Sequence, residues 1–297
     1  MPFRVAVVQA GSVPWDTPAT LLRLDHWTSA AAAAGAQIVV FPEAFVGGYP
    51  KGLDFGVTVG QRTAEGRRLF ARYAECAIDD PAPLAAVAAA HKVWLVVGAI
   101  ERAGGTLYCT VYYLAPDGRV AGKHRKVMPT AMERVIWGFG DGSTLAVIDT
   151  PHGRLGSAIC WENYMPQLRL ALYGQGIQLY CAPTVDDRET WLPTLRHVAM
   201  EGRCFVFSAN QWQVEGEWAA IQGGSAIIGP LGQVLAGPKR DGEGLLLADL
   251  DLASIAEAQF DLDVTGHYSR PDLFVLRVNT SAQSIASLGG RFDRTEP

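Results

Sequence analysis

Short apolar runs alternate with longer amphipathic segments along almost the whole chain. Runs rich in β-branched and aromatic residues predict strands, and segments with apolar residues at helical spacing predict helices. The predicted strands are residues 4–9, 37–41, 93–100, 106–114, 119–122, 145–149, 154–160, 178–182, 204–210, 224–229, 233–236 and 244–251. The predicted helices are residues 17–34, 63–77, 83–91, 166–173 and 188–202. This alternation indicates an α/β fold.

One hydrophobic pattern occurs twice. VYYLAPDGRVAG (111–122) and SAIIGPLGQVLAG (225–237) are both apolar strands that a Pro-x-Gly turn joins to a second short strand. One such hairpin in each half suggests two related sheet layers, although Pro-x-Gly is a good turn in any fold. We expect a single domain over residues 1–280. The remaining residues, 281–297, are rich in Ser, Gly and charge and predict a short flexible tail.

Composition narrows the class of protein. The chain has 297 residues, 49% hydrophobic and 19% charged, with a net charge of −5, so a large core is expected and a nucleic-acid-binding face is not. The amino terminus has no signal-peptide pattern, and the Ala-rich stretch 30–36 is far too short to span a bilayer. Five widely spaced cysteines without a CxxC pair predict free thiols in a cytoplasmic protein and no structural metal site. Because no apolar stretch is long enough to span a bilayer, no membrane association is expected.

Cys160 is the first candidate for chemistry. It ends an apolar strand, and the residues after it lead into a helix, so its thiol is expected at an exposed strand end beside free backbone N–H groups. Cys109, Cys181 and Cys204 lie inside apolar strands and predict core packing. Position alone leaves both interpretations open for Cys160.

A nucleophilic thiol needs a base and a charge partner. No histidine stands out: His197 lies within a helix and His124 in a basic turn. Glu43 directly follows an apolar strand and precedes the Gly-rich loop Gly47–Pro50, and Lys126 also follows a strand. Strand ends are where α/β proteins place functional groups, whereas ordinary solvent exposure is the alternative for both side chains.

Five segments in order across the chain resemble the nitrilase family of carbon–nitrogen hydrolases. They are FPEAFVGGYP (41–50), KHRKVMPTAMERVIWGFGDGS (123–143), GRLGSAICWENYMP (153–166), CAPTVDDRETWLPTLRHVAMEGRCFVFSANQ (181–211) and VTGHYSRPD (264–272). The resemblance implies a four-layer α-β-β-α sandwich, no cofactor, and a homodimer or higher homo-oligomer. It also makes Cys160 the nucleophile, Glu43 the general base, Lys126 the positive group at the developing charge and Glu133 a supporting carboxylate.

The residues after Cys160 refine the expected activity. Cys160-Trp161-Glu162 resembles the true nitrilase branch, which implies hydrolysis of an organic nitrile and water to the carboxylic acid and ammonia through a thioimidate and a thioester. An amidase, a cyanide-hydrolysing enzyme, a Cys–His hydrolase and a non-catalytic binding scaffold are the alternatives. Residues that flank the motifs are predicted to line the substrate pocket: Tyr49, Thr130, Trp161, Val185 and Trp191.

Overall fold

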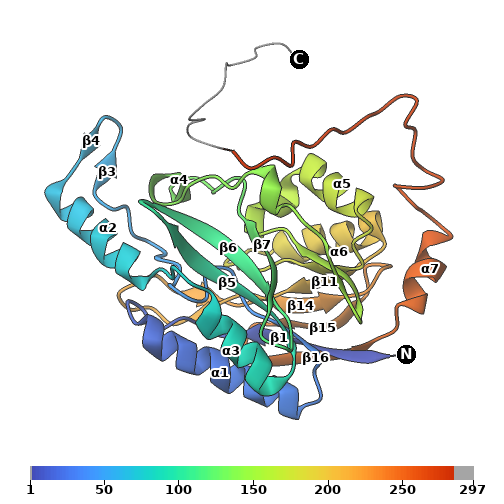
Figure 1. Cartoon of the computed structure of the whole chain (residues 1–297), viewed down its shortest axis with the longest axis horizontal. Helices are drawn as coiled ribbons and strands as arrows, with labels where there is room; N and C mark the ends of the chain where they lie inside the picture. Colours follow the sequence, from blue (N-terminus) through green and yellow to red (C-terminus); the bar gives the residue numbers. More distant parts are fainter. Residues whose placement is uncertain (1, 284–297) are drawn as a thin grey trace.

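The computed structural model describes residues 2–283, and two six-stranded sheets form its centre (Figure 1). The first sheet contains β1 (Phe3–Gln9), β2 (Ile38–Val40), β5 (Trp94–Ala103), β6 (Thr106–Leu114), β7 (Val120–Arg125) and β16 (Gly244–Leu250), in the order β16-β1-β2-β5-β6-β7. The second contains β8 (Ile148–Thr150), β9 (Gly153–Ser157), β10 (Leu179–Cys181), β11 (Phe205–Ser208), β14 (Ser225–Ile228) and β15 (Val234–Lys239), in the order β15-β14-β11-β10-β9-β8.

The two sheets follow one plan. Strands β1, β2 and β5 are parallel neighbours in the first sheet, as β9, β10 and β11 are in the second. A single antiparallel strand flanks each parallel set on one side, β16 in the first sheet and β8 in the second, and an antiparallel hairpin flanks it on the other. These hairpins, β6–β7 and β14–β15, are the two Pro-x-Gly repeats of the sequence. The repeat therefore reflects two equivalent halves.

Helices cover the outer face of each sheet. α1 (Thr17–Ala33) and α3 (Ala82–His91) pack on the first sheet, while α5 (Pro166–Gly174) and α6 (Trp191–Gly202) pack on the second (Figure 1). Alternate residues of a strand point to opposite faces. In β1, Val5 and Val7 accordingly join the core between the sheets, and Ala6 and Val8 join the core under the helices. The predicted α-β-β-α sandwich is confirmed.

Shorter elements were not predicted, because they show too few turns or alternations to give a periodic signal. They are the hairpins β3 (Val57–Thr58)–β4 (Gln61–Arg62) and β12 (Trp212–Gln213)–β13 (Ile221–Gln222), helices α4 (Glu133–Ile136) and α7 (Ala253–Gln259), and the 3₁₀ turns η1 (Gly142–Thr144) and η2 (Cys160–Tyr164). The longer helix α2 (Ala64–Cys76) was predicted, over residues 63–77.

Two further expectations concern the chain as a whole. None of the helices in residues 2–283 is long and apolar enough to cross a bilayer. The predicted tail, 281–297, falls mostly outside the described residues, and the single domain over 1–280 stays a prediction. After α7 the described chain forms no further helix or strand and follows a long arc (Figure 1) to Gln283, whose backbone N–H donates to Asp141 Oδ2 at 2.7 Å.

Candidate active site

Four residues of the sequence prediction meet in one buried cluster. Lys126 Nζ lies 2.6 Å from Glu43 Oε1 and 2.6 Å from Glu133 Oε2. The Cys160 thiol lies close enough to Glu43, Lys126 and Glu133 for their charges to act on its pKa. All four residues are buried, so the alternative of solvent-exposed Glu43 and Lys126 side chains is wrong. The structure thus brings a thiol, an ammonium group and two carboxylates together away from water.

Glu43 is held by both sheets. It lies just beyond β2, and a Cβ on Gly98 of β5 would come within 2.1 Å of Pro42 O and 2.8 Å of Glu43 Cα, so glycine is required there. From the end of the second sheet, Gln211 Nε2 donates to Glu43 O at 2.8 Å. The following residue, Ala44, has a positive φ of 49°, a conformation that favours glycine and that these contacts maintain.

Lys126 follows edge strand β7, and its backbone N–H donates to Cys109 O at 2.8 Å. Its second carboxylate partner, Glu133, begins α4. Glu133 Oε2 also accepts from Thr130 N at 2.6 Å, and Glu133 Oε1 accepts from Tyr49 Oη at 2.8 Å. These contacts fix the carboxylate that balances the lysine charge.

Cys160 lies at a sharp turn between β9 and η2. Its φ is +50°, and its backbone N–H donates to Pro183 O at 2.9 Å. The predicted strand 154–160 ends at Ser157, because Cys160 already begins the 3₁₀ turn. The N–H of Cys160 is therefore engaged, and a residue with positive φ presents the thiol at the end of the strand.

Glu162 and His124 are buried partners that sequence reasoning did not assign. Glu162 accepts from Ile159 N and Val127 N, each at 2.6 Å, and lies 2.9 Å from His124 Nε2. It thereby ties the residue before Cys160 to the residue after Lys126. The placement of His124 in a basic turn is wrong: it lies in β7 and faces inward. The signal was present in the alternation of β7, since Lys123 and Arg125 both reach Glu101 on the opposite side.

Cys109 is buried in β6, as expected, but it also touches the cluster. Its Sγ lies 3.6 Å from Glu43 Oε1. Cys181 and Cys204 are buried in or next to the sheet, in agreement with core packing. All five cysteines, which lie within residues 2–283, are unpaired thiols.

Burial and neighbouring charges have opposing effects on the pKa values of the residues in the cluster. Burial raises the pKa of Glu43 to about 7, although the nearby Lys126 charge opposes the rise. Burial alone would lower the pKa of Lys126, but Glu43, Cys160 and Glu133 hold it well above its usual value. Burial and the Glu43 charge raise the pKa of the Cys160 thiol, and Lys126 and Thr184 oppose that rise. The lysine stays charged, and Glu43 can exchange a proton near neutral pH.

A cavity of about 280 Å³ opens onto Cys160. Of the residues predicted to line a pocket, Tyr49, Thr130, Trp161 and Val185 line this cavity. Four charged residues also line it: Lys51, Asp186, Asp187 and Arg188. Trp191 was predicted to line the pocket, but it does not line this cavity. It begins α6, is 2% exposed and packs in the core between that helix and the second sheet, where its Nε1 donates to Ser208 Oγ at 2.9 Å.

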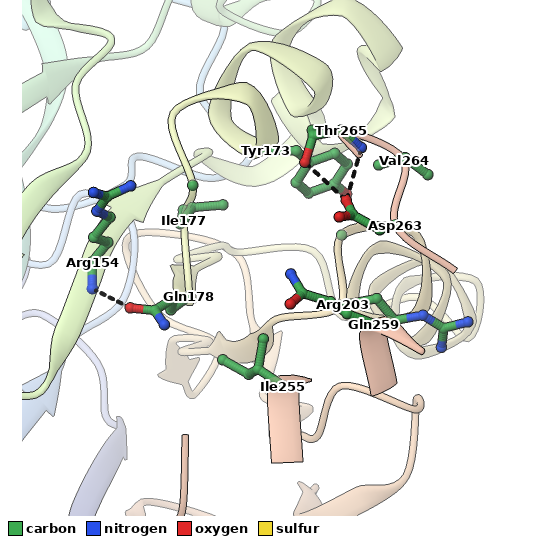
Figure 2. Close-up of a pocket in the computed structure, with 12 residues that line it drawn as sticks. Arg154, Tyr173, Ile177, Gln178, Arg203, Ile255, Gln259, Asp263, Val264 and Thr265 are labelled. Atoms are coloured by element: carbon green, nitrogen blue, oxygen red, sulfur yellow. Dashed lines mark hydrogen bonds between the residues drawn. The ribbon is translucent and has the colours of Figure 1, made fainter. Parts of the chain in front are cut away.

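A larger cavity, of about 370 Å³, lies elsewhere, between the starts of β9 and β10, helix α7 and the segment after it (Figure 2). The guanidinium groups of Arg154 and Arg203 point in different directions in Figure 2, and Asp263 accepts from the backbone and hydroxyl of Thr265, each at 3.0 Å. No cysteine lines this cavity. The candidate active site is therefore the smaller one.

Comparisons with known proteins agree with the fold and identify the family. The carbon-nitrogen hydrolase family model matches residues 4–260. The chain is 54% identical over 298 residues to a bifunctional nitrilase/nitrile hydratase of Lupinus angustifolius, covering 93% of this chain and 85% of that protein. It is 52% identical over 300 residues to an aliphatic nitrilase of Sinorhizobium fredii, covering 95% of this chain and 97% of that one.

Solved structures support the fold at lower identity. Saccharomyces cerevisiae Nit3, a member of branch 10 of the nitrilase superfamily, matches with a TM-score of 0.71 and 22% identity over 90% of this chain and 96% of that chain. An amidase of the nitrilase superfamily from Nesterenkonia matches with a TM-score of 0.69 and 22% identity over 88% and 95% of the two chains. The sandwich and the family match define a hydrolase that acts on carbon–nitrogen bonds. The chain belongs to the carbon–nitrogen hydrolase family, and its sequence relatives include nitrilases.

Proposed function

We propose that the chain is a nitrilase that converts an organic nitrile and two water molecules into a carboxylic acid and ammonia. The observation that supports this most strongly is the buried contact of Lys126 with Glu43 and Glu133 beside the Cys160 thiol. Two relatives at more than half identity are named as nitrilases, which favours nitriles over the amides that the same cluster could hydrolyse.

The first half of the reaction forms a covalent thioimidate. Glu43 accepts the thiol proton of Cys160, and the thiolate attacks the nitrile carbon while one C–N π bond breaks. The nitrogen takes up a proton from Lys126, and the lysine regains one from Glu43. A charged donor already in place at the developing nitrogen anion lowers the barrier because it needs no reorganisation during the step.

The second half releases both products. Glu43 takes a proton from a water that adds to the thioimidate carbon and returns it to the nitrogen. The hydroxyl of the resulting tetrahedral adduct then gives its proton to the nitrogen through Glu43, the C–N bond breaks, and ammonia leaves a thioester behind. A second water, activated in the same way, attacks the thioester; the carbon–sulfur bond breaks, the acid departs and Cys160 recovers its proton. Glu133, held by Tyr49 and Thr130, keeps Lys126 oriented through both halves.

Ammonia release from a panel of nitriles and their matched amides tests this function. We expect turnover of at least one nitrile, a mass increase on Cys160 under single-turnover conditions, and loss of turnover in Cys160→Ala. Cys204→Ala, which changes a buried thiol in the outer core, is the matched control. Turnover of amides without any nitrile would favour the amidase alternative, and turnover of cyanide alone would favour the cyanide-hydrolysing one.

We further propose a cytoplasmic homodimer or larger homo-oligomer built on one domain. Five unpaired cysteines favour a reducing compartment. The segment after α7 exposes a run of apolar side chains, which is typical of an interface: Leu273, Phe274, Val275, Leu276 and Val278. Light scattering should give at least twice the mass of one chain, and Phe274→Asp should reduce that mass. A monomer at micromolar concentration would contradict the assembly.

A further inference from the structure

Thr184 places a hydroxyl group directly on the predicted nucleophile. Its Oγ1 lies 3.2 Å from Cys160 Sγ, and the residue is fully buried. Thr184 follows β10, and its backbone N–H donates to Ala209 O at 2.9 Å, so the second sheet fixes its position. This contact plays no part in the proton transfers described above.

The local hydrogen bonds set the direction of the hydroxyl. Thr184 Oγ1 accepts from the backbone N–H of Asp186 at 2.9 Å. A backbone N–H can only donate, so it occupies a lone pair of the oxygen and leaves the O–H to donate elsewhere. Cys160 Sγ is the acceptor within reach. The result is a chain of donors that runs from Asp186 N through Thr184 Oγ1 to the sulfur.

The charges around Cys160 explain why a neutral donor such as the Thr184 hydroxyl would help to stabilise the thiolate. The Glu43 and Glu133 carboxylates disfavour a negative charge on the sulfur, and Lys126 lies between those same carboxylates. A neutral hydroxyl stabilises a thiolate without adding charge to the cluster, and hydrogen bonds to ionised acceptors are stronger than neutral ones. Thr184 therefore favours the thiolate, which Glu43 and burial disfavour.

We propose that Thr184 is a further catalytic residue, whose hydroxyl donates to the Cys160 sulfur and stabilises the thiolate. The hydrogen bond favours the thiolate before it attacks the substrate carbon, and again when the carbon–sulfur bond of the thioester breaks and the sulfur leaves as an anion. Thr184 keeps its own proton throughout. The roles of attack and departure rest on the proposed function, whereas the effect on the thiol itself does not.

Three variants separate this role from a structural one. Thr184→Val keeps the shape and removes the hydroxyl, Thr184→Ala removes the hydroxyl without adding atoms, and Thr184→Ser keeps it. Thr28→Val is the matched control, because Thr28 is also fully buried and its hydroxyl donates to Leu24 O at 2.7 Å within α1, away from the cluster. Circular dichroism and thermal unfolding identify any variant that does not fold.

The readout is the rate at which iodoacetamide alkylates Cys160, followed by mass spectrometry of its peptide as a function of pH. We expect Thr184→Val, or Thr184→Ala if the valine variant does not fold, to raise the apparent thiol pKa by about one unit. The same variant should lower kcat/KM for a nitrile about tenfold or more. Thr184→Ser and Thr28→Val should keep the wild-type alkylation profile.

The alkylation profile also separates the two proposals. An unchanged profile in the variants without the hydroxyl, or an equal shift in Thr184→Ser, would overturn the role of Thr184. A raised thiol pKa in a protein that releases no ammonia from any nitrile would support Thr184 and overturn the nitrilase function. Ammonia release from nitriles with equal kcat/KM in Thr184→Val and wild type would support the nitrilase function and overturn the role of Thr184.

Discussion

Glu43 must satisfy two opposing requirements at the scale of a single residue. In the proposed mechanism it has to be ionised to accept the proton of Cys160, yet it is buried, which favours its neutral form. The Lys126 charge offsets part of this cost, and the pKa of Glu43 is raised to about 7. A carboxylate with that pKa is a far better base at neutral pH than an ordinary glutamate, because its affinity for the proton matches the working pH.

The pH dependence of kcat/KM follows from this value. Only ionised Glu43 accepts a proton, so kcat/KM should rise with pH and level off above about pH 7. Lys126 adds no alkaline loss near neutrality, because its pKa is held well above the usual value. Ammonia release measured from about pH 5 to about pH 9 tests this. An acidic limb at the pKa of an ordinary glutamate would contradict it.

Tyr49 gives a second prediction at this scale. Its hydroxyl donates to Glu133 Oε1 at 2.8 Å, so Tyr49→Phe should loosen the carboxylate that orients Lys126. Loss of one hydrogen bond to a charged group should lower kcat about tenfold. Tyr180→Phe is the control, since the buried Tyr180 hydroxyl has no partner within residues 2–283. Equal kcat in both variants would remove Tyr49 from the positioning of the cluster.

At the scale of elements, edge strand β7 connects the ion cluster around the buried Glu101 to the candidate active site. Lys123 and Arg125 both contact Glu101 at 2.6 Å across the sheet, while His124 faces Glu162 in the interior. Lys126 follows directly. Because side chains alternate along the strand, the contacts of Lys123 and Arg125 with Glu101 also fix the position of Lys126, the proposed catalytic lysine.

Glu101→Gln should weaken this strand and lower the stability of the protein. Burial alone would raise the pKa of Glu101, but hydrogen bonds from Arg125, Lys123 and Thr110 lower it from 4.5 to about 2. A depressed pKa stabilises the fold above the unfolded value, and that contribution is lost as pH falls towards the folded one. The variant should therefore lose about 2 kcal/mol at neutral pH.

The loss should shrink as pH falls from 4.5 towards 2, which urea unfolding of both proteins at several pH values can follow. Asp79→Asn is the matched control, because Asp79 pairs with Arg102 at the exposed surface. A surface pair contributes little to stability. A difference between Glu101→Gln and wild type that stays constant across this pH range would exclude the electrostatic explanation.

At the scale of the whole molecule, the active site exists because two sheets are held together at their strand ends. Gln211, beyond the second sheet, donates to Glu43 O beside the first. Gln9, at the end of β1, accepts from Gly224 N and Ser225 N of the second sheet, each at 3.0 Å. Both glutamines are fully buried, so they bridge the same interface at different places.

The two bridges should differ in their effect on activity. Gln211→Leu leaves Glu43 O without its donor, so kcat should fall about tenfold or more as well as stability. Gln9→Leu should destabilise the protein by about 1–3 kcal/mol, because buried N–H groups lose their acceptor, with kcat nearly unchanged. Kinetics and urea unfolding of both variants decide the matter. Equal effects on kcat would mean that the site depends on overall packing alone.

The sequence by itself determined the α/β class and the paired hairpins, and its resemblance to the nitrilase family selected the four residues Glu43, Lys126, Glu133 and Cys160. Hydrophobic periodicity identifies which segments are strands and helices, and local motifs identify which residue types stand at strand ends. Both signals are local in the chain. They can be read without knowing how the sheets pack.

Only the tertiary structure decided which other residues touch the cluster. Thr184 is 24 residues from Cys160, His124 is 38 from Glu162, and Gln211 is 168 from Glu43, yet each pair is in hydrogen-bonding contact. Trp191 flanks a motif but faces the core under α6 instead of the cavity. In a sandwich both faces of a strand are buried, so apolar periodicity cannot distinguish the face that meets the site from the face that meets a helix.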